Sequence, residues 1–157
     1  MASAGNSSRV DSGSRLIRAT SNSIYRALID PKAIVAWRPP QGMRAEIREF
    51  DPRVGGAFRM ALFYLDEAIP GKTSENADVI RGRFVDLVPD RRVVERIEFE
   101  SDDAAFDGAM TVSTILEAAP EGTKVTIRCE NVPAGISQAD HQEGIASTLA
   151  NLAAFTE

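Results

Sequence analysis

The chain has 157 residues, a mass of 17.0 kDa and a formal net charge of −5, with 43% hydrophobic and 26% charged residues. This size and composition predict one soluble globular domain. The acidic balance excludes a broad positive field for nucleic acid or anionic lipid. No apolar run is long enough for a membrane span and no secretion signal is visible, so we expect a cytoplasmic protein without nucleic-acid or membrane partners.

The N-terminal part predicts an arm, a short strand and two short helices. Residues 1–12 are small and polar, which indicates a flexible arm before a single domain over residues 13–157. The stretch "RLIRA" predicts a strand, and Thr20 or Ser21 then caps a first helix. Asp30-Pro31 starts a second helix, which "RPPQG" ends.

From residue 43 onward the apolar residues recur with a period of two, which predicts strands with one buried face. Pro89-Asp90, Asp107-Gly108 and Glu121-Gly122 supply turn residues between them. Such short connections favour an antiparallel meander, because parallel neighbours need long crossovers. The six predicted strands lie in "MRAEIREF", "AFRMALFYL", "ADVIRGRFVDL", "RRVVERIEFE", "GAMTVSTILE" and "TKVTIRCE".

The C-terminal segment changes to helical spacing. Ile145, Leu149 and Leu152 share one face, and Ser137 is suited to cap a helix over about residues 137–155. The order of elements therefore predicts an α+β domain, in which a curved antiparallel sheet carries the long helix on its concave side.

Gly55-Gly56 in "FDPRVGGAFRM" allows two interpretations, a phosphate-binding loop or a tight turn. A phosphate loop requires further glycines, a following Lys, Ser or Thr, and a helix whose N-terminus faces the anion. A strand follows here instead, so the pair predicts a turn.

Several segments together resemble the activator of heat shock protein 90 ATPase-like family of the START-like (SRPBCC) superfamily. They are "RATSNSIYRALIDPKAIVAW", "FDPRVGGAFRM", "VIRGRFVDLVPDRRVVE", "EGTKVTI" and "HQEGIASTLANL", in the family's order. The resemblance implies a helix-grip fold, often with a cavity between sheet and C-terminal helix. Related sequences commonly have Trp after the glycine of the last helix, where this chain has Gly144-Ile145.

A cavity of this kind implies a small hydrophobic ligand and a set of inward-facing residues. His141 is the one histidine of the sequence and lies on the inward stripe of the last helix, either as a cavity group or as a helix-start histidine bonded to a carbonyl or carboxylate. Arg59, Arg81 and Arg83 would hold an anion if they turned inward, but solvent-facing side chains are expected. The cavity candidates are Trp37, Ile47, Phe58, Met60, Phe84, Val112, His141, Ile145 and Leu149.

The remaining reactive groups predict no covalent chemistry. Cys129 alternates with Val125 and Ile127, which is typical of a buried small hydrophobe. The cluster of carboxylates in the next loop predicts a solvated acidic turn rather than a metal site; it consists of Asp102, Asp103 and Asp107. We therefore assign no catalytic residue, metal or cofactor.

Three functions remain open. The favoured one is a small-molecule binding module. The second is a cyclase or hydrolase type of enzyme in which His141 or an inward arginine polarises a carbonyl. The third is a chaperone regulator, as the family name implies. The open sheet edges would also allow a homodimer.

Overall fold

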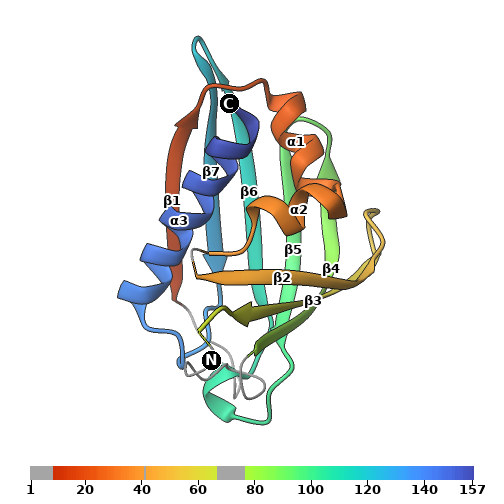
Figure 1. Ribbon diagram of the computed structural model, residues 1–157, viewed down its shortest axis with the longest axis vertical. Coiled ribbons are helices and arrows are strands. Elements are labelled where there is room, and N and C mark those ends of the chain that lie inside the picture. The colour runs from red at the N-terminus through yellow and green to blue at the C-terminus, as the bar shows by residue number, and fades with distance from the viewer. Residues whose placement is uncertain (1–8, 41, 67–76) are drawn as a thin grey trace.

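The computed structural model describes residues 9–157 except 41 and 67–76 (Figure 1). The described residues form seven strands, three α-helices and one 3-10 helix. In chain order the elements are β1 (Val10–Ile17), α1 (Ser21–Ile29), α2 (Pro31–Trp37), β2 (Met43–Phe50), β3 (Ala57–Tyr64), β4 (Ala77–Val88), β5 (Arg92–Phe99), η1 (Ala104–Phe106), β6 (Met110–Ala119), β7 (Gly122–Glu130) and α3 (Gln138–Thr156).

The strands form one antiparallel sheet in the order β1-β7-β6-β5-β4-β3-β2. From β2 to β7 each strand pairs with the next along the chain, as the predicted meander requires. β1 forms the second edge of the sheet. It pairs with β7 along its whole length, from Val10 opposite Glu130 to Ile17 opposite Thr123. The predicted α+β class and helix-grip arrangement are confirmed.

The first strand begins earlier than the sequence pattern indicated. Val10 to Ser12 belong to β1, although they fall inside the segment expected to be a flexible arm. Their backbone pairs with β7, and the Asp11 side chain is fully buried, so these residues are part of the domain. Residues 1–8 of the predicted arm lie outside the described residues.

The helix starts follow the predicted caps. The Thr20 side chain accepts a hydrogen bond from the Ser23 backbone N–H, and Asp30 accepts one from Lys32. Ser137 does the same for the Asp140 N–H at the start of α3. Each cap satisfies one of the backbone donors that the first turn of a helix leaves free.

The helices cover one face of the sheet (Figure 1). α3 lies along β1 and β7, α1 contacts the central strands β5 and β6, and α2 contacts the edge strand β2. Both short helices also contact α3. The core between these layers includes the fully buried side chains of Ile17, Ile24, Val125 and Leu152. Burying such a side chain contributes roughly 1.5–3 kcal/mol, so this face supplies most of the driving force for folding.

The Gly55-Gly56 pair forms a turn, as predicted. Gly55 has φ +84°, a value that favours glycine, and a Cβ on Gly56 would lie 2.0 Å from the Asp51 carbonyl oxygen. The Gly55 N–H donates to the Phe84 carbonyl at 2.8 Å and the Gly56 N–H to that of Arg53 at 2.7 Å. Both donors are therefore occupied, which rules out a phosphate cradle made of these amides.

α3 approaches β1 closely at Gly13. A Cβ at this position would lie 2.9 Å from the Cγ2 methyl of Ile145, whose side chain is branched at Cβ and restricted to one preferred rotamer in a helix. Glycine at position 13 thus permits the distance between helix and sheet.

We expect Gly13→Ala to lower the free energy of unfolding by about 1–3 kcal/mol through overpacking. Denaturant titration would measure the change. Ile145→Leu removes Cγ2, so the same substitution in that background should cost less. Gly144→Ala is the matched control, because its Cβ would meet nothing within 4 Å and a helix interior favours alanine by roughly 0.5–1 kcal/mol. Equal effects at both glycines would contradict the close approach at Gly13.

Candidate ligand site

A row of directly opposed residues crosses the buried face of the sheet. Asp11 on β1 lies opposite Cys129, Cys129 opposite Val112, Val112 opposite Glu95 and Glu95 opposite Phe84. Directly opposed residues have Cβ atoms roughly 4.5–5.5 Å apart, so this row joins five strands. Two of its members are acids, and both are buried.

The first buried acid, Glu95, pairs with an arginine at the end of α2. Arg38 is the C-cap residue of that helix, and its Nη1 lies 3.2 Å from Oε2 and 3.5 Å from Oε1 of Glu95. The two side chains are 20% and 6% exposed. Burying both charges costs desolvation free energy, which a pair of apolar side chains at the same positions would not cost.

A small pocket borders this ion pair between α2 and strands β2, β3 and β5. Its free volume of about 10 Å³ is close to what one water molecule needs. The apolar lining consists of Ile34, Ile47, Phe50, Phe58 and Met60, and the charged lining of Arg38, Glu49, Arg59 and Glu95. Three of the predicted cavity residues, Ile47, Phe58 and Met60, therefore meet here.

The other predicted cavity residues do not line this pocket and have contacts of their own. The Trp37 indole N–H donates to the Ala27 carbonyl at 2.9 Å, which ties α2 to α1. The Phe84 ring packs against Phe50 and Phe58, with centroids 5.5 and 5.2 Å away. Val112 belongs to the row described above, and Ile145 and Leu149 are buried on α3.

The second buried acid, Asp11, holds the start of α3. Nδ1 of His141 lies 2.7 Å from Asp11 Oδ2, and Arg9 Nη2 lies 3.0 Å from the same oxygen. Oδ1 of Asp11 is buried without a hydrogen-bond partner in the structure. The contact is the one predicted for a helix-start histidine bonded to a carboxylate, and it connects α3 to β1.

Cys129 lies between these acids and is 3% exposed, as expected for a small buried residue. Burial, followed by the nearby Asp11 carboxylate, raises the pKa of the thiol to about 12. Because the thiolate is the reactive form, Cys129 is chemically inert in the folded protein.

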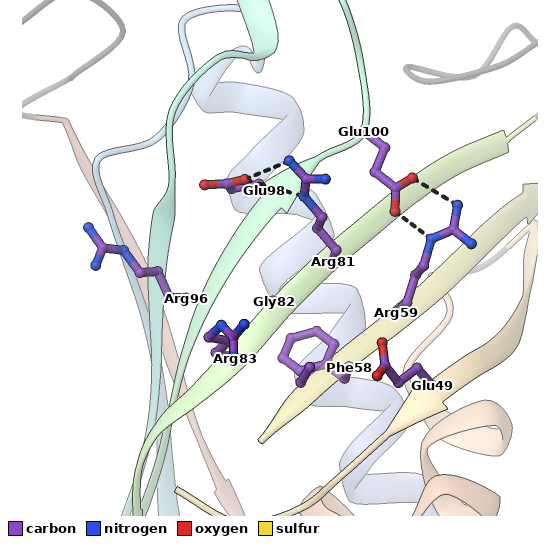
Figure 2. Close-up of a pocket in the computed structure, with 10 residues that line it drawn as sticks. Glu49, Phe58, Arg59, Arg81, Gly82, Arg83, Arg96, Glu98 and Glu100 are labelled. Atoms are coloured by element: carbon purple, nitrogen blue, oxygen red, sulfur yellow. Dashed lines mark hydrogen bonds and ion pairs between the residues drawn. The ribbon is translucent and has the colours of Figure 1, made fainter. Parts of the chain in front are cut away.

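The three arginines considered as inward anchors instead project from the opposite face of the sheet (Figure 2). Arg59 makes a two-pronged ion pair with Glu100, at 2.6 and 2.8 Å, which lowers the pKa of that carboxyl. Arg81 pairs with Glu98 at 3.2 Å. Arg83 donates to the Gly55 carbonyl at 3.1 Å. The expectation of solvent-facing arginines is confirmed.

The acidic turn has a structural role at one residue. The Asp103 side chain accepts a hydrogen bond from the Ala105 N–H and caps η1.

Over residues 9–157 without 41 and 67–76, no group of three or more His, Cys, Asp or Glu side chains could hold a metal ion. In the same part of the chain no helix combines the length and apolarity needed to cross a membrane.

Sequence reasoning missed Asp11, Arg38 and Glu95. A signal for Glu95 was present, because in "RRVVERIEFE" it shares the phase of Val93 and Ile97, which are both buried. Asp11 has the same phase as Ile17 but falls in the segment assigned to the arm. Arg38 follows a helix end and gave no comparable signal.

These observations define a class of protein, the helix-grip domain, in which an antiparallel sheet packs against a long C-terminal helix. A family model described as "Activator of Hsp90 ATPase homolog 1-like protein" matches residues 18–157, and the chain belongs to this family. Among curated proteins no significant match is found.

Solved structures agree with this assignment. A protein from Chromobacterium violaceum is 30% identical, with a TM-score of 0.84 over 94% of this chain and 96% of that one. An AHSA1-like protein from Aeromonas hydrophila is 19% identical, with a TM-score of 0.70 over 94% and 91%. A protein from Rhodobacter sphaeroides is 17% identical, with a TM-score of 0.77 over 95% and 92%. The last two share the fold.

The Cys129 thiol is expected to resist alkylation in the folded protein. At pH 8 a pKa of about 12 leaves roughly one thiol in ten thousand as thiolate, and burial blocks access as well. Mass spectrometry after iodoacetamide treatment should find an unmodified chain without denaturant and one adduct with it. Rapid labelling of the folded chain would contradict the burial.

Removing Arg38 should destabilise the protein, because it leaves the Glu95 carboxylate buried without its partner. We expect Arg38→Met to cost about 1–3 kcal/mol in the free energy of unfolding, and Arg38→Met with Glu95→Met to recover most of it. The control is Arg81→Met, whose exposed pair with Glu98 should contribute under about 1 kcal/mol. Equal costs at Arg38 and Arg81 would contradict the role given to burial.

Proposed function

We propose that this domain binds a small, mainly apolar molecule with one polar group, between the sheet and the helices that cover it. The observation that carries the proposal is the buried Arg38–Glu95 pair beside a pocket with five apolar lining residues, which Glu49 and Arg59 also border. Ligand sites combine apolar walls with a few placed polar groups, and this pocket has that composition.

The ion pair supports a ligand role because stability does not explain it. A buried pair replaced by apolar residues of similar size often leaves stability unchanged or improves it. At Glu95 the alternation of the strand calls for an apolar residue, and its neighbours in phase, Val93 and Ile97, are apolar. In the proposed function the Arg38 guanidinium binds the polar group of the ligand, and Glu95 holds the arginine in place.

The small free volume requires the pocket to widen when a ligand enters. α2 is the element that would move, since it has seven residues and isolated helices of this length are marginal. The Trp37 bond to Ala27 keeps α2 attached to α1, and Asn151 Nδ2 of α3 donates to the Pro39 carbonyl at 2.8 Å. The two short helices would therefore shift together, and their movement against α3 would have to break the Asn151–Pro39 bond.

The two other functions have weaker support. The Asp11 contact orients the His141 ring as a general base would require, but His141 lines neither the pocket beside Glu95 nor the arginine-lined groove on the opposite face. Stimulation of a chaperone ATPase is named in the description of the family, and for this chain it stays a prediction.

Native and denaturing mass spectra of the purified protein would test the proposal. We expect a small molecule in the native spectrum that is lost on unfolding. Added back at about a hundred times its dissociation constant, that molecule should stabilise the fold by roughly 2.7 kcal/mol. Absence of any retained molecule, together with no stabilisation by apolar carboxylates or alcohols, would refute it.

Two glutamates of β5 provide a matched pair of variants. Glu95→Gln neutralises the buried partner of Arg38, and Glu98→Gln neutralises the exposed partner of Arg81 on the other face. Binding of the retained molecule should weaken by roughly tenfold or more in the first and stay unchanged in the second. If both variants bind equally well, the ligand lies elsewhere in the domain.

A further inference from the structure

An open groove lies on the face of the sheet opposite the helices (Figure 2). Its volume of about 670 Å³ is within the range of small-molecule sites. The described residues that line it are Glu49, Ala57, Phe58, Arg59, Arg81, Gly82, Arg83, Arg96, Glu98 and Glu100. Four are arginines and three are glutamates, so the outer groove is locally positive although the chain carries a net charge of −5.

Two of these arginines are directly opposed. Arg83 on β4 lies across from Arg96 on β5 in the register of the sheet. Like charges in this position are destabilising, and opposite charges would be expected if stability alone determined the pair. The Arg83–Arg96 pair therefore carries a charge repulsion that replacing either arginine by glutamate would remove.

The nearby carboxylates do not neutralise this pair. Glu98 is bonded to Arg81, and Glu100 to Arg59. Among the residues that the structure describes, no carboxylate forms an ion pair with Arg83 or Arg96. Arg83 uses one amino group on the Gly55 carbonyl, and the Arg96 side chain extends away from Arg83 (Figure 2). Since no carboxylate of the described residues holds either guanidinium group, both can turn over the groove.

We propose that the outer groove binds a small phosphomonoester that also carries hydroxyl groups, such as a sugar phosphate. Arg83 and Arg96 occupy directly opposed positions, so their guanidinium groups can turn toward one phosphate dianion and supply the forked donors that it accepts. Glu49 and Glu100 lie near Arg59, and Glu98 lies beside Arg81 (Figure 2). Their carboxylate oxygens have further lone pairs that can accept hydrogen bonds from hydroxyl groups. The site thus matches a ligand with an anionic end and a donor-rich end.

The residues that line the outer groove also favour this ligand class over nucleotides and anionic lipids. The one aromatic residue among the lining residues described, Phe58, is 4% exposed and offers no surface for stacking a nucleobase. Beside it, Ala57 is the other apolar side chain, so the groove lacks the exposed apolar groups that would enter a membrane. A compact hydroxylated phosphate remains as the class that uses the donors and the acceptors together.

Titration calorimetry at low ionic strength, with glucose 6-phosphate, inorganic phosphate and glucose as probes, tests the proposal. Glucose 6-phosphate should bind roughly tenfold more tightly than phosphate, and glucose should not bind. Absence of binding by glucose 6-phosphate at millimolar concentration would overturn the proposal. Equal affinity for phosphate and the sugar phosphate would overturn the recognition of hydroxyl groups.

Variants locate the binding. Arg83→Gln and Arg96→Gln should each weaken glucose 6-phosphate binding by roughly tenfold, while both proteins melt no lower than the parent, because a like-charge contact is removed. Arg128→Gln removes an arginine of the same face that is paired with Glu130, and it should bind like the parent. Equal loss in Arg128→Gln would overturn the site. The outer groove shares Glu49, Phe58 and Arg59 with the pocket beside Glu95, but Glu95 does not line the groove, and Arg83 and Arg96 do not line that pocket. The Glu95→Gln and the Arg83 and Arg96 variants therefore test the two sites separately.

Discussion

The fold depends on covering one apolar face of an antiparallel sheet. Side chains from every strand reach this face, and α3 together with α1 and α2 removes it from water. Gly13 sets how closely α3 approaches β1, and the contact between Asp11 and His141 fixes where α3 starts. Among the elements that the structure describes, the helices are the layer that buries this surface.

The helices that cover this face also make each polar group beneath them costly to bury, so such groups point to a role beyond stability. Water solvates a charge on the outer face at little cost, so Arg59 and Arg81 can form ion pairs there without a strict requirement for geometry. A charge under the helices needs a specific partner, which Arg38 supplies for Glu95. The buried ion pair and the unpartnered oxygen of Asp11 are therefore two places where the described core departs from what stability favours.

Periodicity predicted the meander and the faces of Cys129 and Arg83. Capping preferences predicted helix starts at Thr20 or Ser21, at Asp30 and at Ser137, because each cap depends on local chemistry. Periodicity could not predict which inward residues border free space, since Ile47 and Val112 have the same phase in their strands but different neighbours from distant elements. Asp11 was missed because a short polar strand resembles an arm until β7 pairs with it. Arg38 was missed because its partner lies 57 residues away.

The pairing of β1 with β7 has a consequence for how the protein forms during synthesis. Residues 10–17 meet their partners at residues 123–130, so the first strand waits until most of the chain has left the ribosome. Contacts of such sequence separation slow folding, because a large loop must close before they form. Until then β1 and the free edge of the meander remain open to pairing with other chains, which is the stage at which the nascent protein most needs protection from aggregation.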